Sequence, residues 1–295
     1  MRPNAGSFPY TDENGTVWLA FMDFGERSRD RVVVCVHGLT RNGRDFDRLA
    51  VAMAKDFRVI EVDVAGRGRS GWLADKSAYG FPIYLKHMAA LLDYRGLEHV
   101  DWIGTSMGGI IGMLIAAQPE SPIRRLVLND VGPFIPKAAL ERIGERVGQD
   151  PRFRNHQEAA EYFREAYAEF GIPDEVAWSD LTLHSTVRQE NGTYALHYDP
   201  AIAEPFKQPA EDVDLWAVWD AITCPVLVLR GENSDLLTRE TAREMTRRGP
   251  KAELVEFPGC GHAPALMSEE QIAVVHDWLL SFDDTEEEQT GDVAG

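Results

Sequence analysis

Short, continuous apolar runs alternate along this chain with segments of helical periodicity, and this alternation restricts the fold most strongly. The apolar runs lie at 31–36, 57–62, 100–103, 126–128, 225–229 and 253–257, with helical patterns near 46–53, 82–92, 110–117, 238–248 and 269–281. Strands that are apolar along their whole length are buried on both faces, as in parallel sheets covered by helices. We therefore expect an α/β fold with a mostly parallel, doubly wound sheet, to which 16–24 adds an antiparallel edge strand.

The alternation stops between residues 131 and 216. This stretch is charged and rich in Tyr and Phe (EAAEYFREAYAEF), and it contains no apolar run of the kind seen elsewhere. We interpret it as a helical cap inserted between two strands of the sheet. The core is then formed by 1–130 and 217–283. The acidic stretch 284–295 has no core-forming residues, so we expect a disordered tail.

The charge balance disfavours several classes of partner. The 30 Lys+Arg against 48 Asp+Glu give a net charge of −18, whereas nucleic acids and anionic membranes attract clustered positive charge. Residues 1–15 are polar, with no signal-peptide pattern, and the longest apolar run, 110–117, is too short to span a bilayer. We expect no nucleic-acid or membrane partner. Three cysteines without a CxxC motif favour a reducing, cytoplasmic location.

A G-x-S-x-G motif, Gly104-Thr105-Ser106-Met107-Gly108, lies directly after one apolar strand and directly before an apolar helix. A sharp strand-to-helix turn needs small flanking residues, and it lifts the serine hydroxyl above the sheet next to a helix N-terminus. The alternative is a glycine-rich turn with an ordinary serine, which the strand–turn–helix context disfavours. We therefore predict that Ser106 is a nucleophile.

A serine nucleophile requires a base and an acid, and the later strands supply candidates for both. His262 follows the run 253–257 in GCGH, and Asp235 follows the run 225–229 in RGENSD. Loops after parallel strands open at one edge of the sheet, and the order Ser, Asp, His is that of this architecture. We predict His262 as the base and Asp235 as the acid. Asp130, after 126–128, is the runner-up for the acid, and Glu232 is a weaker candidate.

The turn His37-Gly38-Leu39-Thr40 follows the first strong parallel strand. An anionic tetrahedral intermediate needs two hydrogen-bond donors that are fixed in advance. The backbone N–H groups of Leu39 and Met107 form the natural pair. For His37 itself we prefer a structural role in holding the loop.

At this point the chain resembles the α/β-hydrolase superfamily of serine type. The motifs HGLT, GRGRS, GTSMGG, RGENSD and GCGH carry the resemblance, which covers residues 15–282. It implies an eight-stranded sheet with a helical cap, no cofactor, and oxyanion donors at residues 39 and 107. The nearest resemblance is to bacterial carboxylesterase-like members, some of which cleave aliphatic polyesters.

A second glycine motif, G-x-G-x-x-G at 66–71, imitates a dinucleotide-binding fingerprint, with Asp93 at a suitable distance. That fingerprint must open a helix at once, whereas Gly80 and Pro82 mark the following residues as loop. No closely spaced set of His, Cys and Asp suggests a metal. We expect neither a cofactor nor a metal.

These observations predict hydrolysis of carboxylic esters, small or oligomeric, through an acyl-enzyme. The same triad would serve a C–C bond hydrolase of ring-cleavage products, a perhydrolase or an acyltransferase. A C–C hydrolase needs a cationic group in its pocket, and the candidate Arg41 is expected at the surface. From a different class, the chain could be a non-catalytic small-molecule receptor, although such a receptor has no need of an acid–base pair.

Overall fold

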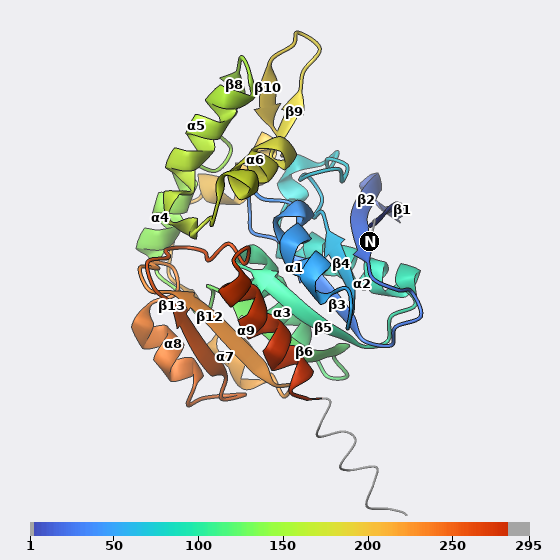
Figure 1. Ribbon diagram of the computed structural model, residues 1–295, viewed down its shortest axis with the longest axis vertical. Coiled ribbons are helices and arrows are strands. Elements are labelled where there is room, and N and C mark those ends of the chain that lie inside the picture. Colours follow the sequence, from blue (N-terminus) through green and yellow to red (C-terminus); the bar gives the residue numbers. More distant parts are fainter. Residues whose placement is uncertain (1–2, 283–295) are drawn as a thin grey trace, which may run out of the picture.

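The computed structural model describes residues 3–282, and an eight-stranded sheet forms its centre (Figure 1). The strand order is β1-β2-β4-β3-β5-β6-β12-β13. β2 pairs antiparallel with β1 and β4, and the strands from β4 to β13 run parallel. The strands are β1 (Asn4–Asp12), β2 (Gly15–Phe24), β3 (Val32–Val36), β4 (Arg58–Val62), β5 (Val100–Thr105), β6 (Ile123–Asn129), β12 (Val226–Gly231) and β13 (Glu253–Phe257).

The expectation of a mostly parallel, eight-stranded sheet is confirmed, but the predicted edge strand is wrong in one respect. The segment 16–24 belongs to β2, which lies second from the edge because β1 pairs along its whole outer side. β1 escaped the sequence interpretation because Phe8 is its one buried residue among polar and turn-forming neighbours. Burial alternates from Gly6 to Asp12, but the inward positions other than Phe8 carry Gly6, Tyr10 and Asp12, so the sequence shows almost no alternation of apolar and polar residues.

Helices cover both faces of the sheet and enclose a hydrophobic core on each side (Figure 1). α1 and α9 contribute buried residues to one face, whereas α2, α3, α7 and α8 contribute to the other. β3 and β4 are buried along their entire length, which explains the continuous apolar run of β3 and the apolar residues of β4, although β4 also buries Arg58 and Glu61. These helices are α1 (Asp47–Met53), α2 (Phe81–Arg95), α3 (Met107–Ala116), α7 (Trp216–Asp220), α8 (Arg239–Met245) and α9 (Glu269–Leu280).

Between β6 and β12 the chain leaves the main sheet and forms a separate layer over one end of it (Figure 1). Its helices are α4 (Lys137–Gly144), α5 (His156–Ala166) and α6 (Glu175–His184). Asn155 caps α5 by accepting the Glu158 N–H, and Ala159 and Phe163 form the buried side of that helix. The other helices among residues 3–282 are the 3₁₀ helices η1 (Gly43–Phe46), η2 (Lys76–Ala78), η3 (Ala168–Phe170) and η4 (Pro200–Lys207).

Besides its helices, the insertion contains two small sheets, which the interpretation as a helical cap did not include. Their strands span two or three residues each and include charged side chains, so they give no periodic signal. They are β7 (Phe134–Ile135), β8 (Arg152–Phe153), β9 (Thr186–Arg188), β10 (Tyr194–Leu196) and β11 (Val213–Asp214). The predicted tail, 284–295, lies outside the described residues.

Over residues 3–282, the structure has no helix with both the length and the apolar character needed to cross a bilayer.

Candidate active site

Ser106 occupies the turn between β5 and α3, in a strained backbone conformation with φ of 51°. A positive φ is costly for a serine, and it persists because its surroundings fix it. The flanking glycines are required by packing. A Cβ on Gly104 would lie 2.3 Å from Gly108 O, and one on Gly108 would lie 1.9 Å from Val36 O. The motif is therefore the sharp turn that the sequence predicts, with Ser106 at its apex.

His262 lies in the loop after β13 and faces Ser106. Its Nε2 is 3.0 Å from Ser106 Oγ, and its Nδ1 is 2.7 Å from Asp130 Oδ2. Both distances are within hydrogen-bond reach, so the hydroxyl, imidazole and carboxylate form one continuous chain. The structure thus brings together the predicted nucleophile and the predicted base.

The prediction that Asp235 orients His262 is wrong, and the runner-up Asp130 holds that position. Asp130 follows β6 and is fully buried. Its Oδ1 accepts the Gly231 N–H at 2.8 Å, and its Oδ2 accepts the Ser234 hydroxyl at 2.6 Å. These two bonds join the ends of the adjacent strands β6 and β12, and they aim the carboxylate at the imidazole.

Asp235 points the other way. Its side chain is 51% exposed, and its two oxygens accept from Arg142 of α4 at 2.5 and 2.6 Å. The neighbouring Ser234 takes the inward position in this loop by donating to Asp130. The next residue along the chain is therefore directed toward α4 and forms an ion pair there.

Both residues predicted to donate to the oxyanion, Leu39 and Met107, belong to segments next to Ser106. Leu39 and Ser106 line the same cavity, and Met107 is the first residue of α3. Within residues 3–282 neither backbone N–H has a protein acceptor. N–H groups at the start of a helix have no partner inside the helix, so they suit a developing anion.

His37 is a structural residue, in agreement with the preferred interpretation. It is fully buried, its Nδ1–H donates to Gly38 O at 2.7 Å, and its Nε2 accepts the Val64 N–H at 3.0 Å. Burial lowers the pKa of His37 to about 3, so the ring is neutral. The imidazole therefore fixes the turn that carries Leu39.

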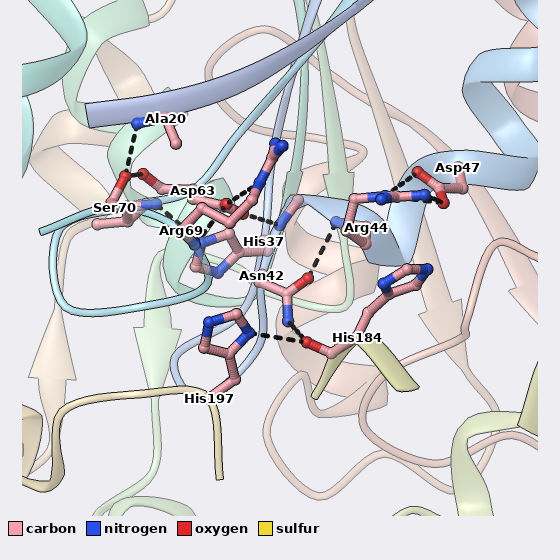
Figure 2. A network of polar contacts seen from close by, with 12 residues as sticks. Ala20, His37, Asn42, Arg44, Asp47, Asp63, Arg69, Ser70, His184 and His197 are labelled. Carbon is pink, nitrogen blue, oxygen red and sulfur yellow. Dashed lines mark hydrogen bonds and ion pairs between the residues drawn. The ribbon is translucent and has the colours of Figure 1, made fainter. Parts of the chain in front are cut away.

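The GRGRS segment anchors three parts of the core to each other (Figure 2). Ser70 donates to Asp63 O and accepts the Ala20 N–H, while the Asp63 carboxylate accepts the N–H groups of Gly43 and Arg69. No helix opens directly after Gly71, and the next element is the single turn η2. Ser70 is buried and occupied in this network, away from the site of Ser106.

Arg67, in the same segment, is a residue of the site that the sequence interpretation missed. It is fully buried, its Nε donates to Leu39 O at 2.8 Å, and its Nη2 lies 3.6 Å from Met107 Sδ. Its Nη1 donates to Ala65 O and to the Tyr84 hydroxyl. Arg67 therefore touches both predicted oxyanion residues. Nothing in a GRG turn sequence signals this, since the contacts join segments far apart in the chain.

A cavity of about 160 Å³ lies above Ser106, between the sheet edge and the inserted layer. Its lower wall includes Gly38, Ser106 and His262, and its upper wall is largely apolar and aromatic, with Tyr162 and Phe170. The two layers are also joined beside the cavity, where Asn42 donates to His184 O at 3.1 Å (Figure 2).

Arg41 lines this cavity, so the expectation that it lies at the surface is wrong. It is 5% exposed. The Asp45 carboxylate accepts hydrogen bonds from Arg41 Nε and Nη2, and the Arg41 guanidinium lies 4.8 Å from the ring centre of Tyr167. These contacts compensate the buried charge. Within the described residues, no group of three or more His, Cys, Asp or Glu side chains could hold a metal.

Comparisons with known proteins agree with this geometry. The model of the alpha/beta hydrolase family matches residues 33–275. A 3-hydroxybutyrate-oligomer hydrolase of Cupriavidus necator is 44% identical over 282 residues, covering 92% of this chain and 96% of the relative. A solved putative hydrolase from Rickettsia typhi has a TM-score of 0.89 at 34% identity, over 95% of this chain and 99% of its own. An alpha/beta hydrolase from Novosphingobium aromaticivorans has a TM-score of 0.83 at 40% identity, over 92% and 97%.

Proposed function

The chain belongs to the alpha/beta hydrolase family and is a carboxylic ester hydrolase, and from that premise we propose that it cleaves short oligomers of 3-hydroxy acids through an acyl-enzyme on Ser106. The observation that carries the mechanism is the chain of hydrogen bonds from Ser106 through His262 to the buried Asp130. The similarity to an oligoester hydrolase over nearly the whole chain supports the substrate class.

Each residue has one role in the proposed cycle. His262 Nε2 takes the Ser106 proton as Oγ attacks the ester carbonyl carbon, and Asp130 holds the Nδ1–H and stabilises the imidazolium. The N–H groups of Leu39 and Met107 donate to the oxyanion. His262 then gives the proton to the leaving alkoxide, and a water molecule repeats the sequence to release the acid and free Ser106.

The inserted layer supports a limited substrate size. We assign residues 131–216 as a cap domain on the core formed by 1–130 and 217–283. The cap places aromatic side chains over Ser106 and leaves a cavity of about 160 Å³. A concave, mostly apolar site that is partly open to solvent suits small esters and short oligomers better than the surface of a solid polymer.

A second candidate is hydrolysis of a C–C bond in a dienoate, and one observation favours it. That reaction needs a cation in the pocket, and Arg41 lines the cavity. We keep it as the rival reaction for the assay below.

The cysteines support a reducing, cytoplasmic location as part of the proposal. Cys35, Cys224 and Cys260 are all free, and burial raises the pKa of each thiol. The acidic charge of the chain supports the absence of a nucleic-acid partner.

The test compares wild type with Ser106→Ala on p-nitrophenyl esters of increasing acyl length, on 3-hydroxybutyrate dimer and trimer, and on a ring-cleavage dienoate. We expect the wild type to cleave the oligomers, and Ser106→Ala to lose at least about a thousandfold in kcat. Turnover of the dienoate alone would replace ester cleavage with C–C cleavage. Binding without any turnover would indicate a receptor.

A further inference from the structure

The cavity above Ser106 is more basic than the protein that contains it. The chain has an excess of acidic residues and a net charge of −18. The charged side chains that line the cavity beside His262 are nevertheless three arginines, Arg41, Arg142 and Arg146, against one aspartate, Asp45. Such a reversal of charge at the site attracts anionic ligands.

Ion pairs with aspartates compensate the charges of two of these arginines, and the third arginine has no such pair. Arg41 pairs with Asp45, and Arg142 pairs with Asp235. Arg146 lines the cavity with an exposed side chain, and no ion pair or side-chain hydrogen bond joins it to another of the described residues. It follows α4 and faces Tyr162 across the upper wall: burial raises the pKa of Tyr162, and the charge of Arg146 opposes that rise.

Arg41 adds a second donor from the lower wall. The Asp45 carboxylate accepts hydrogen bonds from Arg41 Nε and Nη2, whereas Arg41 Nη1 is buried without a hydrogen-bond partner among the described residues. A buried, charged donor without an acceptor costs free energy until a ligand supplies one. Arg41 and Ser106 line the same cavity and flank Gly38, because a Cβ on Gly38 would lie 3.8 Å from both Arg41 Cγ and Ser106 Cβ.

We propose that Arg146 and Arg41 bind the terminal carboxylate of the substrate, so that the enzyme selects esters whose leaving alcohol ends in a carboxylate. A 3-hydroxy acid oligomer carries this group at one end, a few bonds from its last ester. Arg41 is the fixed donor, and Arg146 is the adaptable one. The enzyme then removes units from the carboxylate end. This inference rests on the proposed ester hydrolysis and names the feature of the substrate that the site recognises.

The experiment compares two substrates with the same scissile bond: the 3-hydroxybutyrate dimer as the free acid and as its methyl ester. At pH 7 the acid is ionised. We expect wild type to favour the acid by about ten- to a hundredfold in kcat/KM, since hydrogen bonds to a charged group are the stronger ones. Arg146→Gln should reduce this ratio at least several-fold, chiefly through KM, because the carboxylate does not change during the reaction.

Arg154→Gln is the matched control, because Arg154 is an exposed cap arginine paired with Glu158 and does not line the cavity. It removes the same charge and should leave the ratio unchanged. Arg41→Gln should also lower the ratio, and any damage to the neighbouring Leu39 turn would affect both substrates alike. Equal kcat/KM for acid and methyl ester in wild type, or an unchanged ratio in Arg146→Gln, would overturn the inference.

Two further measurements separate this inference from the proposed function. Turnover of p-nitrophenyl butyrate by wild type reports ester hydrolysis without any carboxylate. Calorimetric titration of Ser106→Ala with the free-acid dimer reports carboxylate binding without any turnover. Tight binding that Arg146→Gln weakens at least several-fold supports the subsite even if the ester assay fails. Ester turnover with equal binding of acid and methyl ester refutes the subsite and leaves the proposed function standing.

Discussion

Replacement of Asp130 and of Asp235 by asparagine distinguishes the two carboxylates that could complete the triad. Asp130→Asn preserves the shape of the buried site, and its amide oxygen can still accept the Gly231 N–H. Its amide nitrogen, however, donates where His262 Nδ1 needs an acceptor. The imidazole then adopts the tautomer that carries its proton on Nε2, where it cannot accept the Ser106 proton.

The expected magnitudes differ by orders of magnitude. Loss of the correct tautomer in a serine triad lowers kcat about ten-thousandfold, which corresponds to about 5.5 kcal/mol of transition-state stabilisation. Asp235→Asn removes a solvent-exposed ion pair with Arg142, in which the side chains are 51% and 47% exposed. Such pairs contribute about 0–1 kcal/mol, so kcat should change by less than about fivefold.

The assay is steady-state hydrolysis of p-nitrophenyl butyrate, with circular dichroism to verify that each variant is folded. The double variant Ser106→Ala/Asp130→Asn should be no slower than Ser106→Ala, because residues of one triad act as a unit. A loss of a thousandfold or more in Asp235→Asn, with Asp130→Asn within tenfold of wild type, would refute the assignment of Asp130.

Three other predictions follow from single contacts. Arg67→Met removes the donor to Leu39 O and should lower kcat about ten- to a hundredfold with little change in KM; a pure rise in KM would contradict its positioning role. Gly108→Ala should lower the free energy of unfolding by about 3 kcal/mol or more, because its Cβ would lie 1.9 Å from Val36 O. The control Gly80→Ala, whose Cβ would have its nearest contact at 3.7 Å, should lower it by less than about 1 kcal/mol. Denaturant titrations measure both values. Burial and, second, the charge of Asp47 raise the pKa of the Glu61 carboxyl well above its usual range. Folding therefore favours protonated Glu61, and the resulting stability is lost as pH rises from its unfolded pKa toward its folded pKa. Glu61→Gln should therefore flatten the fall in unfolding free energy above about pH 5, and parallel curves for the two proteins would contradict this.

The local features of this protein could be predicted from sequence because they depend on short-range sterics and on burial. Continuous apolar runs identify strands that are covered on both faces, and β3 and β4 are buried along their whole length. The turn at Ser106 requires glycine on both sides, so the motif itself indicates the geometry. His262 follows from its place after the last strand of the sheet. These inferences need only a few neighbouring residues.

The choice between Asp130 and Asp235 could not be made in this way. Each residue follows a strand, β6 or β12, and these two strands are neighbours in the sheet, so both loops open at the same edge. The direction of each side chain depends on partners far along the chain. Asp130 is fixed by Gly231 and Ser234, whereas Asp235 is held by Arg142.

Arg41 and Arg67 show the same limit. In sequence each is an arginine in a polar loop, which is the usual pattern of an exposed residue. Arg41 is buried because Asp45 and the cap residue Tyr167 enclose it, and Arg67 because carbonyl oxygens and Tyr84 satisfy its donors. Sequence alone therefore predicted the parallel strands of the sheet, and it identified Ser106 and His262, which the structure places within hydrogen-bond distance of each other. Tertiary structure decided the acid and the charges of the pocket, because burial of a charge depends on the compensation that distant segments provide.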